Sequence, residues 1–180
     1  SKELNNRHLL AILTASKSTV IYAIVQNRMM ELSVISKIYA KTGNLWTIYN
    51  YLAKMDRTMR ESFTAISHLM SEAEKICVEE KDLTGLAYVL LTRAFIYGHF
   101  AFLLRSFFDT DPTQNIEASE RTYELAESIY RKINQPENVA AIHNDRAYVY
   151  WSVGKLDKAK EYAHEAIRLG TEHNLKALIQ

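Results

Sequence analysis

The chain has 180 residues, 48% of them hydrophobic and 24% charged, and its 22 basic and 21 acidic side chains leave a formal net charge of +1. This composition excludes intrinsic disorder, and the near-neutral balance supplies no overall field that would attract nucleic acid or an anionic membrane. Five glycines and two prolines are too few for the turns of a β-rich protein, so we expect an all-α fold.

The first helix is expected over residues 3–42, which contain no glycine or proline. Its polar middle, "TASKST", leaves open a break into two helices. The uncharged stretch at 19–27 is too short to span a bilayer, so we expect no membrane segment. Apolar residues at helical spacing predict the buried face; they are Leu9, Leu13, Val20, Ile24, Leu32, Ile35 and Tyr39.

A turn at 42–44 leads into the most regular segment, residues 45–77, where apolar residues recur every three or four positions. Two long helices joined by so short a turn should form an antiparallel hairpin, which we assign to residues 1–81. If Met55, Met59 and Phe63 extend beyond the partner helix, they leave an apolar strip that could pair with a second copy, so a homodimer is possible.

Shorter helices are expected in the remaining segment, 82–180, packed continuously with the hairpin as one domain. They cover about 86–108, 115–134, 136–153 and 156–173, and residues from 175 resemble the start of a seventh helix. Pro136 suits a first helical turn, and Gly154 suits the turn between the last two helices.

An internal repeat is visible in "RAFIY" at 93–97, which returns 53 residues later as "RAYVY" at 146–150. The alignment continues without a gap from Ala73 and Ala126. Small residues match small residues, as expected where two helices approach closely. A third copy begins at Ala166, about 40 residues after Ala126, and places Asn174 on Asn134.

Residues 140–171 resemble the tetratricopeptide repeat, a pair of antiparallel helices that stacks into a superhelix. The resemblance lies in the small residues, one aromatic residue and the turn; these are Ala147, Tyr150, Gly154, Lys155, Leu156, Asp157, Ala159 and Ala166. The sequence departs from the family at His143, Arg146, Ala163 and Thr171. The missing proline at Thr171 gives a longer second helix, as in the arrays of bacterial regulatory proteins.

The resemblance implies a TPR-like superhelix whose first helices line a concave groove for a peptide or helix of a partner protein. Carried over by position, the partner-binding groove contains Tyr88, Leu91, Phe95, Phe102, Asn144, Tyr148 and Trp151. The expected function is a cytoplasmic protein–protein interaction module or scaffold, part of a larger regulatory or signalling protein. The alternative is self-assembly through the N-terminal hairpin.

Catalytic and metal-binding patterns are missing from the sequence, so we expect neither enzymatic activity nor a cofactor. The segment 109–120 resembles a calcium loop, but Gln114 stands where that loop needs glycine, and we interpret its aspartates as a helix cap. Arg93 and Arg146 are expected to pair with nearby acids, such as Asp145 or Glu127. The single cysteine, Cys77, is consistent with a reducing cytoplasm.

Overall fold

The computed structural model describes the backbone of residues 2–42, 45–108 and 111–174, and the side chains of 6–27, 54, 57–58, 61–102 and 111–174. Within these ranges the chain is all-helical and contains no strand. The helices are α1 (Lys2–Thr42), α2 (Leu45–Glu79), α3 (Leu83–Phe108), α4 (Thr113–Lys132), α5 (Pro136–Ser152) and α6 (Leu156–Glu172). The all-α prediction is confirmed, and α1 is one helix. The expected turn at 43–44 and the start of a seventh helix at 175 lie outside the described residues.

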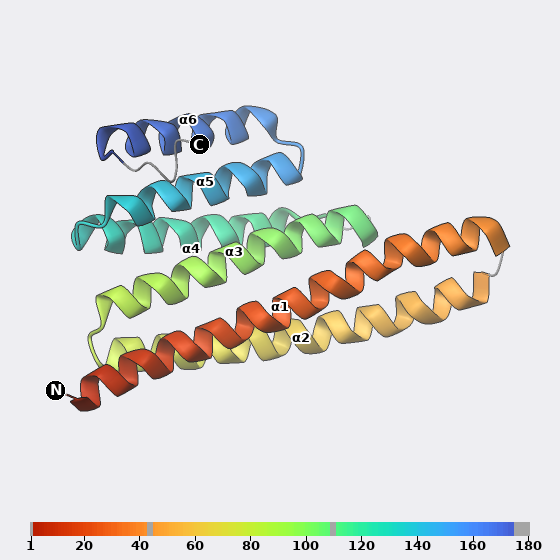
Figure 1. Cartoon of the computed structure of the whole chain (residues 1–180), viewed down its shortest axis with the longest axis horizontal. Coiled ribbons are helices and arrows are strands. Elements are labelled where there is room, and N and C mark those ends of the chain that lie inside the picture. Colours follow the sequence, from red (N-terminus) through yellow and green to blue (C-terminus); the bar gives the residue numbers. More distant parts are fainter. Residues whose placement is uncertain (1, 43–44, 109–110, 175–180) are drawn as a thin grey trace.

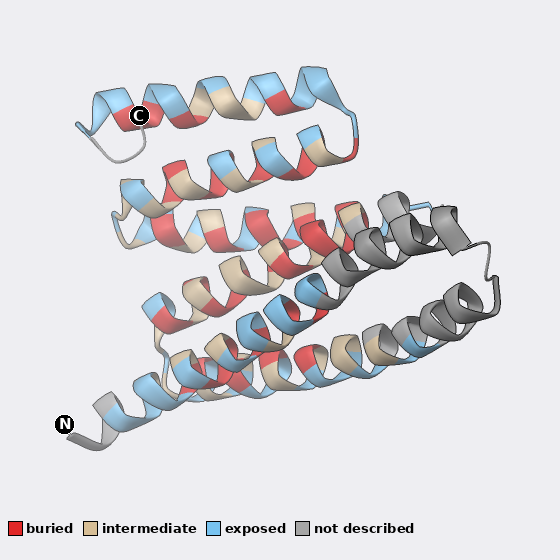
Figure 2. Ribbon diagram, turned by 45° about the vertical axis from the view of Figure 1, so that its right-hand side comes forward, coloured by how far each residue is buried: buried red, intermediate tan, exposed pale blue. Residues whose placement is uncertain are grey.

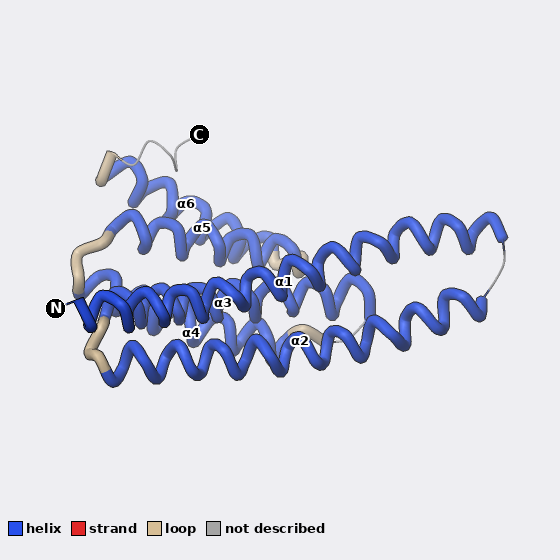
Figure 3. The backbone as a smooth tube through the Cα atoms, turned by 60° about the horizontal axis from the view of Figure 1, so that its bottom comes forward, coloured by secondary structure: helices blue, strands red, loops and turns tan. Residues whose placement is uncertain are grey.

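The helices form three antiparallel pairs, α1/α2, α3/α4 and α5/α6, stacked one beside the next (Figure 1). Each first helix contacts the first helix of the neighbouring pair, so α1, α3 and α5 lie in sequence across the stack. Each second helix also contacts the first helix that follows it, α2 against α3 and α4 against α5. The α1/α2 pair extends well past the other helices at one end (Figure 3).

The three copies of the repeat end in the same backbone conformation. Lys81, Asn134 and Asn174 follow α2, α4 and α6, and all three have a positive φ, of 55°, 56° and 54°. These positions match one another in the sequence alignment. The left-handed residue stops each second helix and turns the chain, so the alignment corresponds to a repeated structural unit.

Small residues occupy the close contacts, and buried residues, red in Figure 2, recur along the helices of the stack. Ala73, Ala126, Ala87 and Ala140 are fully buried. Ala147 departs from its counterpart in the middle copy, which is fully buried, because Ala147 is partly exposed. Its helix, α5, belongs to the last pair, and no described helix follows that pair to cover it.

The expected buried face of α1 is wrong. Leu9, Leu13, Val20 and Ile24 are all more than half exposed, and the helix instead packs through a set of mostly small residues. That set is Ala11, Ala15, Ser18, Tyr22 and Val25. Small side chains let α1 approach α2 and α3 closely, and this dense packing outweighs the burial of larger residues on the other face. The side chains of Leu32, Ile35 and Tyr39 lie outside the described residues.

The regular segment of α2 packs inward. Ile66, Met70 and Cys77 are buried against α1 and α3. Phe63, expected on an exposed strip, is half-buried, with its ring 5.0 Å from that of Phe100 in an edge-to-face contact. This contact covers part of the Phe63 side chain. The side chains of Met55 and Met59 lie outside the described residues.

Among the described residues, two helical stretches are long and apolar enough to cross a membrane by length and composition. Leu83–Phe102 in α3 is largely buried among the other helices, as a core helix is. Asn6–Asn27 in α1 is only about one-third buried. This second stretch is longer than the segment at 19–27 noted in the sequence, because interspersed small and polar residues do not interrupt its apolar character.

Candidate functional site

Five aromatic rings form a continuous series across the first helices of the three pairs, and we call this series the ring row. It runs from Tyr22 on α1 through Phe95 and His99 on α3 to Tyr148 and Trp151 on α5. The Tyr22 ring meets the His99 ring edge-on, with centroids 5.5 Å apart. The rings of His99 and Tyr148 stack at 5.0 Å, and Trp151 lies 5.8 Å beyond Tyr148.

Exposure is greatest at the α5 end of the ring row. Tyr22 is 4% exposed and His99 8%, whereas Tyr148 is 43% exposed and Trp151 60%. The buried rings therefore hold one face of the Tyr148 ring in a fixed position. Two large aromatic side chains are presented to solvent on a rigid base, an arrangement that lowers the conformational entropy lost when a partner binds.

His99 connects the ring row, because its ring contacts rings on all three first helices. Its Nδ1 lies 2.9 Å from the Phe95 carbonyl oxygen, to which it donates a hydrogen bond. Burial lowers the pKa of His99, and the hydrogen bond to Phe95 opposes that shift only in part. The imidazole is therefore neutral at pH 7, and the Tyr148 ring stacks on it.

The hydroxyl of Tyr22 lies in the same buried region. Burial, reinforced by the nearby Tyr148, raises the pKa of Tyr22 well above its ordinary value. Tyr22 consequently stays protonated at physiological pH, so the buried part of the ring row carries no charge. A neutral, aromatic surface of this kind favours an apolar partner over a charged one.

The structure brings three of the seven expected groove residues together. Phe95, Tyr148 and Trp151 are joined through His99, and Asn144 is exposed one turn before Tyr148 on α5.

The other three expected groove residues are half-buried and contribute to the core. Tyr88 and Phe102 pack against the cluster formed by α1, α2 and α3. Leu91 packs against the cluster on the opposite side of α3. They lie on faces of α3 that other helices already cover in part.

Sequence reasoning missed Tyr22 and His99 as members of the ring row. His99 follows Phe95 by four residues, and this spacing on a helix places both rings on one face. That signal was present in the sequence. Tyr22 belongs to a different helix, and only the packing of α1 against α3 brings its ring to His99.

A second cluster is ionic and joins α4, α5 and α6. The Arg146 guanidinium is almost completely buried and donates from Nη2 to Glu120 Oε2 at 2.8 Å and from Nη1 to Glu127 Oε2 at 3.2 Å. It also lies over the Tyr162 ring, 4.5 Å from its centroid. The expected pairing of Arg146 with Glu127 is confirmed. Because every donor faces a group of its own chain, this cluster is structural.

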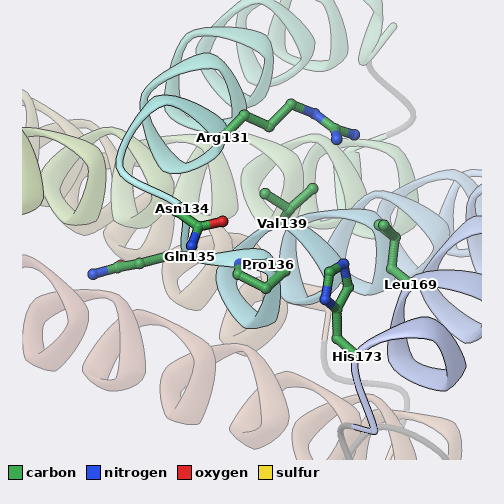
Figure 4. Close-up of a pocket in the computed structure, with 7 residues that line it drawn as sticks. All are labelled: Arg131, Asn134, Gln135, Pro136, Val139, Leu169 and His173. Atoms are coloured by element: carbon green, nitrogen blue, oxygen red, sulfur yellow. The ribbon is translucent and has the colours of Figure 1, made fainter.

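A shallow pocket of about 190 Å³ lies where α4, α5 and α6 meet (Figure 4). It is smaller than the roughly 300–1,000 Å³ of a typical small-molecule site. Its one guanidinium, from Arg131, is already paired with Glu127 at 2.7 Å. In the described part of the chain no three His, Cys, Asp or Glu side chains gather as a metal ion would require. The pocket is therefore a weak candidate beside the ring row.

The aspartate of the calcium-like loop that the structure describes acts within its own segment. Asp111 Oδ1 accepts hydrogen bonds from the Thr113 backbone N–H at 3.0 Å and from its hydroxyl at 2.6 Å, at the start of α4. This is the helix-cap role expected from the sequence. Asp109, the first residue of the loop, lies outside the described residues.

No known protein family, characterised protein or solved structure matches this chain. The function is therefore argued from the geometry of the chain itself.

Proposed function

We propose that this chain is a TPR-like protein–protein interaction module that binds an apolar peptide or helix of a partner protein along the ring row. The stacking supports this proposal: three antiparallel helix pairs place α1, α3 and α5 side by side, as the first helices of such repeats lie. The shared turn after each second helix, at Lys81, Asn134 and Asn174, supports it further.

The single observation that carries the proposal is the exposure of Tyr148 and Trp151 on a base of buried rings. Tyrosine and tryptophan contribute most of the energy of many protein interfaces. Here their orientation is fixed in advance by the stack on His99. An apolar side chain inserted beside Trp151 would cover both rings and bury apolar surface at about 25 cal/mol per Å².

The partner is a protein segment, and the role is that of a non-enzymatic module in a larger cytoplasmic regulatory or signalling protein. A net charge of +1 offers no attraction for a polyanion. In the ionic cluster, the buried Arg146 pairs with Glu120 and Glu127, and these groups do not face an open site. These features fit recognition better than catalysis.

The experiment is a selection of binding peptides from a displayed random library against the full chain, followed by affinity measurement. The test variant is Tyr148→Ala combined with Trp151→Ala. A matched control combines Leu125→Ala with Ile167→Ala, two similarly exposed residues on second helices. Circular dichroism of both variants establishes that each retains its helices.

We expect selected peptides to be apolar, to lose at least about tenfold in affinity for the test variant, and to bind the control as they bind the parent chain. Equal binding to both variants would place the interface elsewhere. Loss of helicity in the test variant would show that the two exposed rings are part of the core and are not a recognition surface.

A further inference from the structure

The first helices α3 and α5 carry the same five-residue pattern on the side that faces the preceding pair. Two apolar residues, an arginine and two more apolar residues follow one another at spacings of three, four, three and four. The pattern is Leu86, Val89, Arg93, Ile96 and Phe100 on α3, and Val139, Ile142, Arg146, Val149 and Val153 on α5. Nine of these ten side chains are buried or packed against a core cluster, and the tenth, Arg93, is half-buried.

The arginine at the centre of each pattern pairs with a glutamate of the preceding second helix. Arg93 Nη2 lies 2.6 Å from Glu74 Oε2 on α2. Arg146 Nη1 lies 3.2 Å from Glu127 Oε2 on α4, and Glu74 and Glu127 occupy equivalent positions of the repeat. Each first helix therefore contacts the preceding pair through an apolar stripe with an arginine at its centre, and this arginine forms one ion pair on α3 and several on α5.

The outer face of α1 carries this pattern a third time, at the same spacings. Its members are Leu10, Leu13, Lys17, Val20 and Ile24, and we call them the α1 strip. The four apolar members are between 51% and 61% exposed, and α1 shows long pale-blue segments (Figure 2). Lys17 is exposed and forms no ion pair among the described residues, and no described helix covers this side of α1.

We propose that the α1 strip is a docking surface for a helix of a second protein that presents an apolar stripe with a glutamate or aspartate opposite Lys17. On α3 and α5, this pattern is buried by the two helices of the preceding pair, and the second of those helices supplies the carboxylate. We therefore expect the α1 strip to bind a helix with the same features, an apolar stripe and a central carboxylate. This site is distinct from the ring row, and the proposal stands whether or not the ring row binds a peptide.

Charge argues against a second copy of this chain as the occupant. If a second copy stacked head to tail, its α6 would lie against α1 as α4 lies against α5. The repeat period of 40 residues then places Lys160 and Ile167 where α4 has Glu120 and Glu127. Lys17 would then meet a lysine and an aliphatic side chain. In a symmetric antiparallel pairing of two α1 helices, Lys17 lies at the centre of the strip and would face its own copy. Both arrangements bring like charges together.

A lipid surface fits the α1 strip less well than a helix does. The inner face of α1 is fixed in the core through Ala11, Ala15 and Tyr22, so the helix could not enter a bilayer without leaving the fold. The strip also holds a cation at its centre and not at its edge. An acidic side chain on a docked helix satisfies that cation, whereas hydrocarbon does not.

The test uses the full chain and a fluorescein-labelled synthetic peptide of residues 113–135, which carries Glu120 and Glu127 in the required register. A second version of the peptide has a lactam bridge on its outer face to hold it helical. We expect saturable binding by fluorescence anisotropy, with a Kd below about 1 mM. Leu13→Gln combined with Val20→Gln should weaken binding at least about tenfold, whereas the matched control Leu125→Gln should leave it unchanged.

A charge exchange tests the ionic part of the proposal. Lys17→Glu should weaken binding several-fold, and a peptide carrying Glu120→Lys and Glu127→Lys should bind that variant better than it binds the parent chain. Lys17, Leu13 and Val20 are exposed, so these variants should keep the fold, which thermal melting verifies.

Three results would overturn the proposal. The first is failure of both peptides to bind, or binding that is indifferent to the strip variants. The second is dimerisation of the chain alone, measured by sedimentation velocity, that Leu13→Gln with Val20→Gln abolishes, since a second copy would then be the occupant. The third is binding of the chain to phosphatidylcholine vesicles that the same double variant abolishes.

Discussion

Replacement of Arg146 by alanine should unfold the chain far more readily than replacement of its repeat counterpart Arg93. The Arg146 side chain is 6% exposed and holds two glutamates that are themselves only 16–18% exposed. Removal of one member of a buried ionic cluster leaves uncompensated charges, and we expect Arg146→Ala to lower the free energy of unfolding by about 3–5 kcal/mol.

Arg93 makes a single ion pair with Glu74, whose side chain is 37% exposed, so solvent screens the pair. Arg93→Ala should therefore cost only about 1 kcal/mol. Urea unfolding followed by circular dichroism measures both values, provided that the dependence on urea concentration is the same for each variant. Equal costs for the two variants, or a cost for Arg146→Ala below about 1 kcal/mol, would refute the account of the ionic cluster.

Lysine at position 146 supplies a further control. It keeps the positive charge but cannot bridge Glu120 and Glu127 together, and it loses the planar contact with the Tyr162 ring. Arg146→Lys should therefore recover part of the stability lost in Arg146→Ala and not all of it. Full recovery would mean that charge alone, without the geometry of the guanidinium, accounts for the cluster.

Three further predictions concern pH and packing. The hydrogen bond from His143, assisted by Arg131, holds the pKa of Glu127 at about 2, against an ordinary value of 4.5. The stability that the ionised carboxylate supplies should therefore be lost as the pH falls from 4.5 towards 2, and Glu127→Gln should remove this acid-dependent loss in a urea titration at each pH. Burial raises the pKa of Asp145 from 3.8 to about 6, so its ionisation lowers the stability of the fold as the pH rises from 3.8, and the full cost is reached above about 6. Asp145→Asn should increase the free energy of unfolding at pH 7 by up to about 3 kcal/mol, and no gain would contradict this. A Cβ at Gly98 would collide with the Val149 side chain across the α3–α5 contact; Gly98→Ala should therefore lower the melting temperature, and Val149→Ala in the same chain should offset part of that loss in a double-mutant cycle.

Much of the fold could be predicted from the sequence because the signals that begin and end its helices are local. Pro136 and Gly154 mark the ends of α5, and Asn134 matches Asn174 at the turn after a second helix. The alignment of Ala73 with Ala126 located the close contacts, since a position that must be small in one copy must be small in the next. These signals depend on a few neighbouring residues and do not require the tertiary arrangement.

The orientation of α1 could not be predicted in the same way. Its sequence contains two apolar stripes, a large one through Leu13 and Val20 and a small one through Ala11 and Ala15, and periodicity alone ranks the large one as the core face. Close packing against two helices selects the small stripe instead. On α3 and α5 the same pattern faces the preceding helix pair, whereas on α1 the large stripe is exposed among the described residues.

The ring row was predictable in its parts and not as a whole. The spacing of Tyr148 and Trp151 placed both on one side of α5, and that side is exposed. The stacking of Tyr148 on His99 depends on the lateral offset between α3 and α5. The close contact of Gly98 with Val149 helps to set that offset. No residue pattern within one helix records that offset.

The fluorescence of Trp151 tests the binding role of the ring row most directly. In a chain carrying Trp46→Phe, Trp151 is the remaining tryptophan and reports only on the exposed end of the row. Titration with a peptide selected for binding should shift its emission saturably to shorter wavelength, and Tyr148→Ala should weaken that titration at least about tenfold. A peptide that binds while the Trp151 emission stays unchanged would contradict the proposed site.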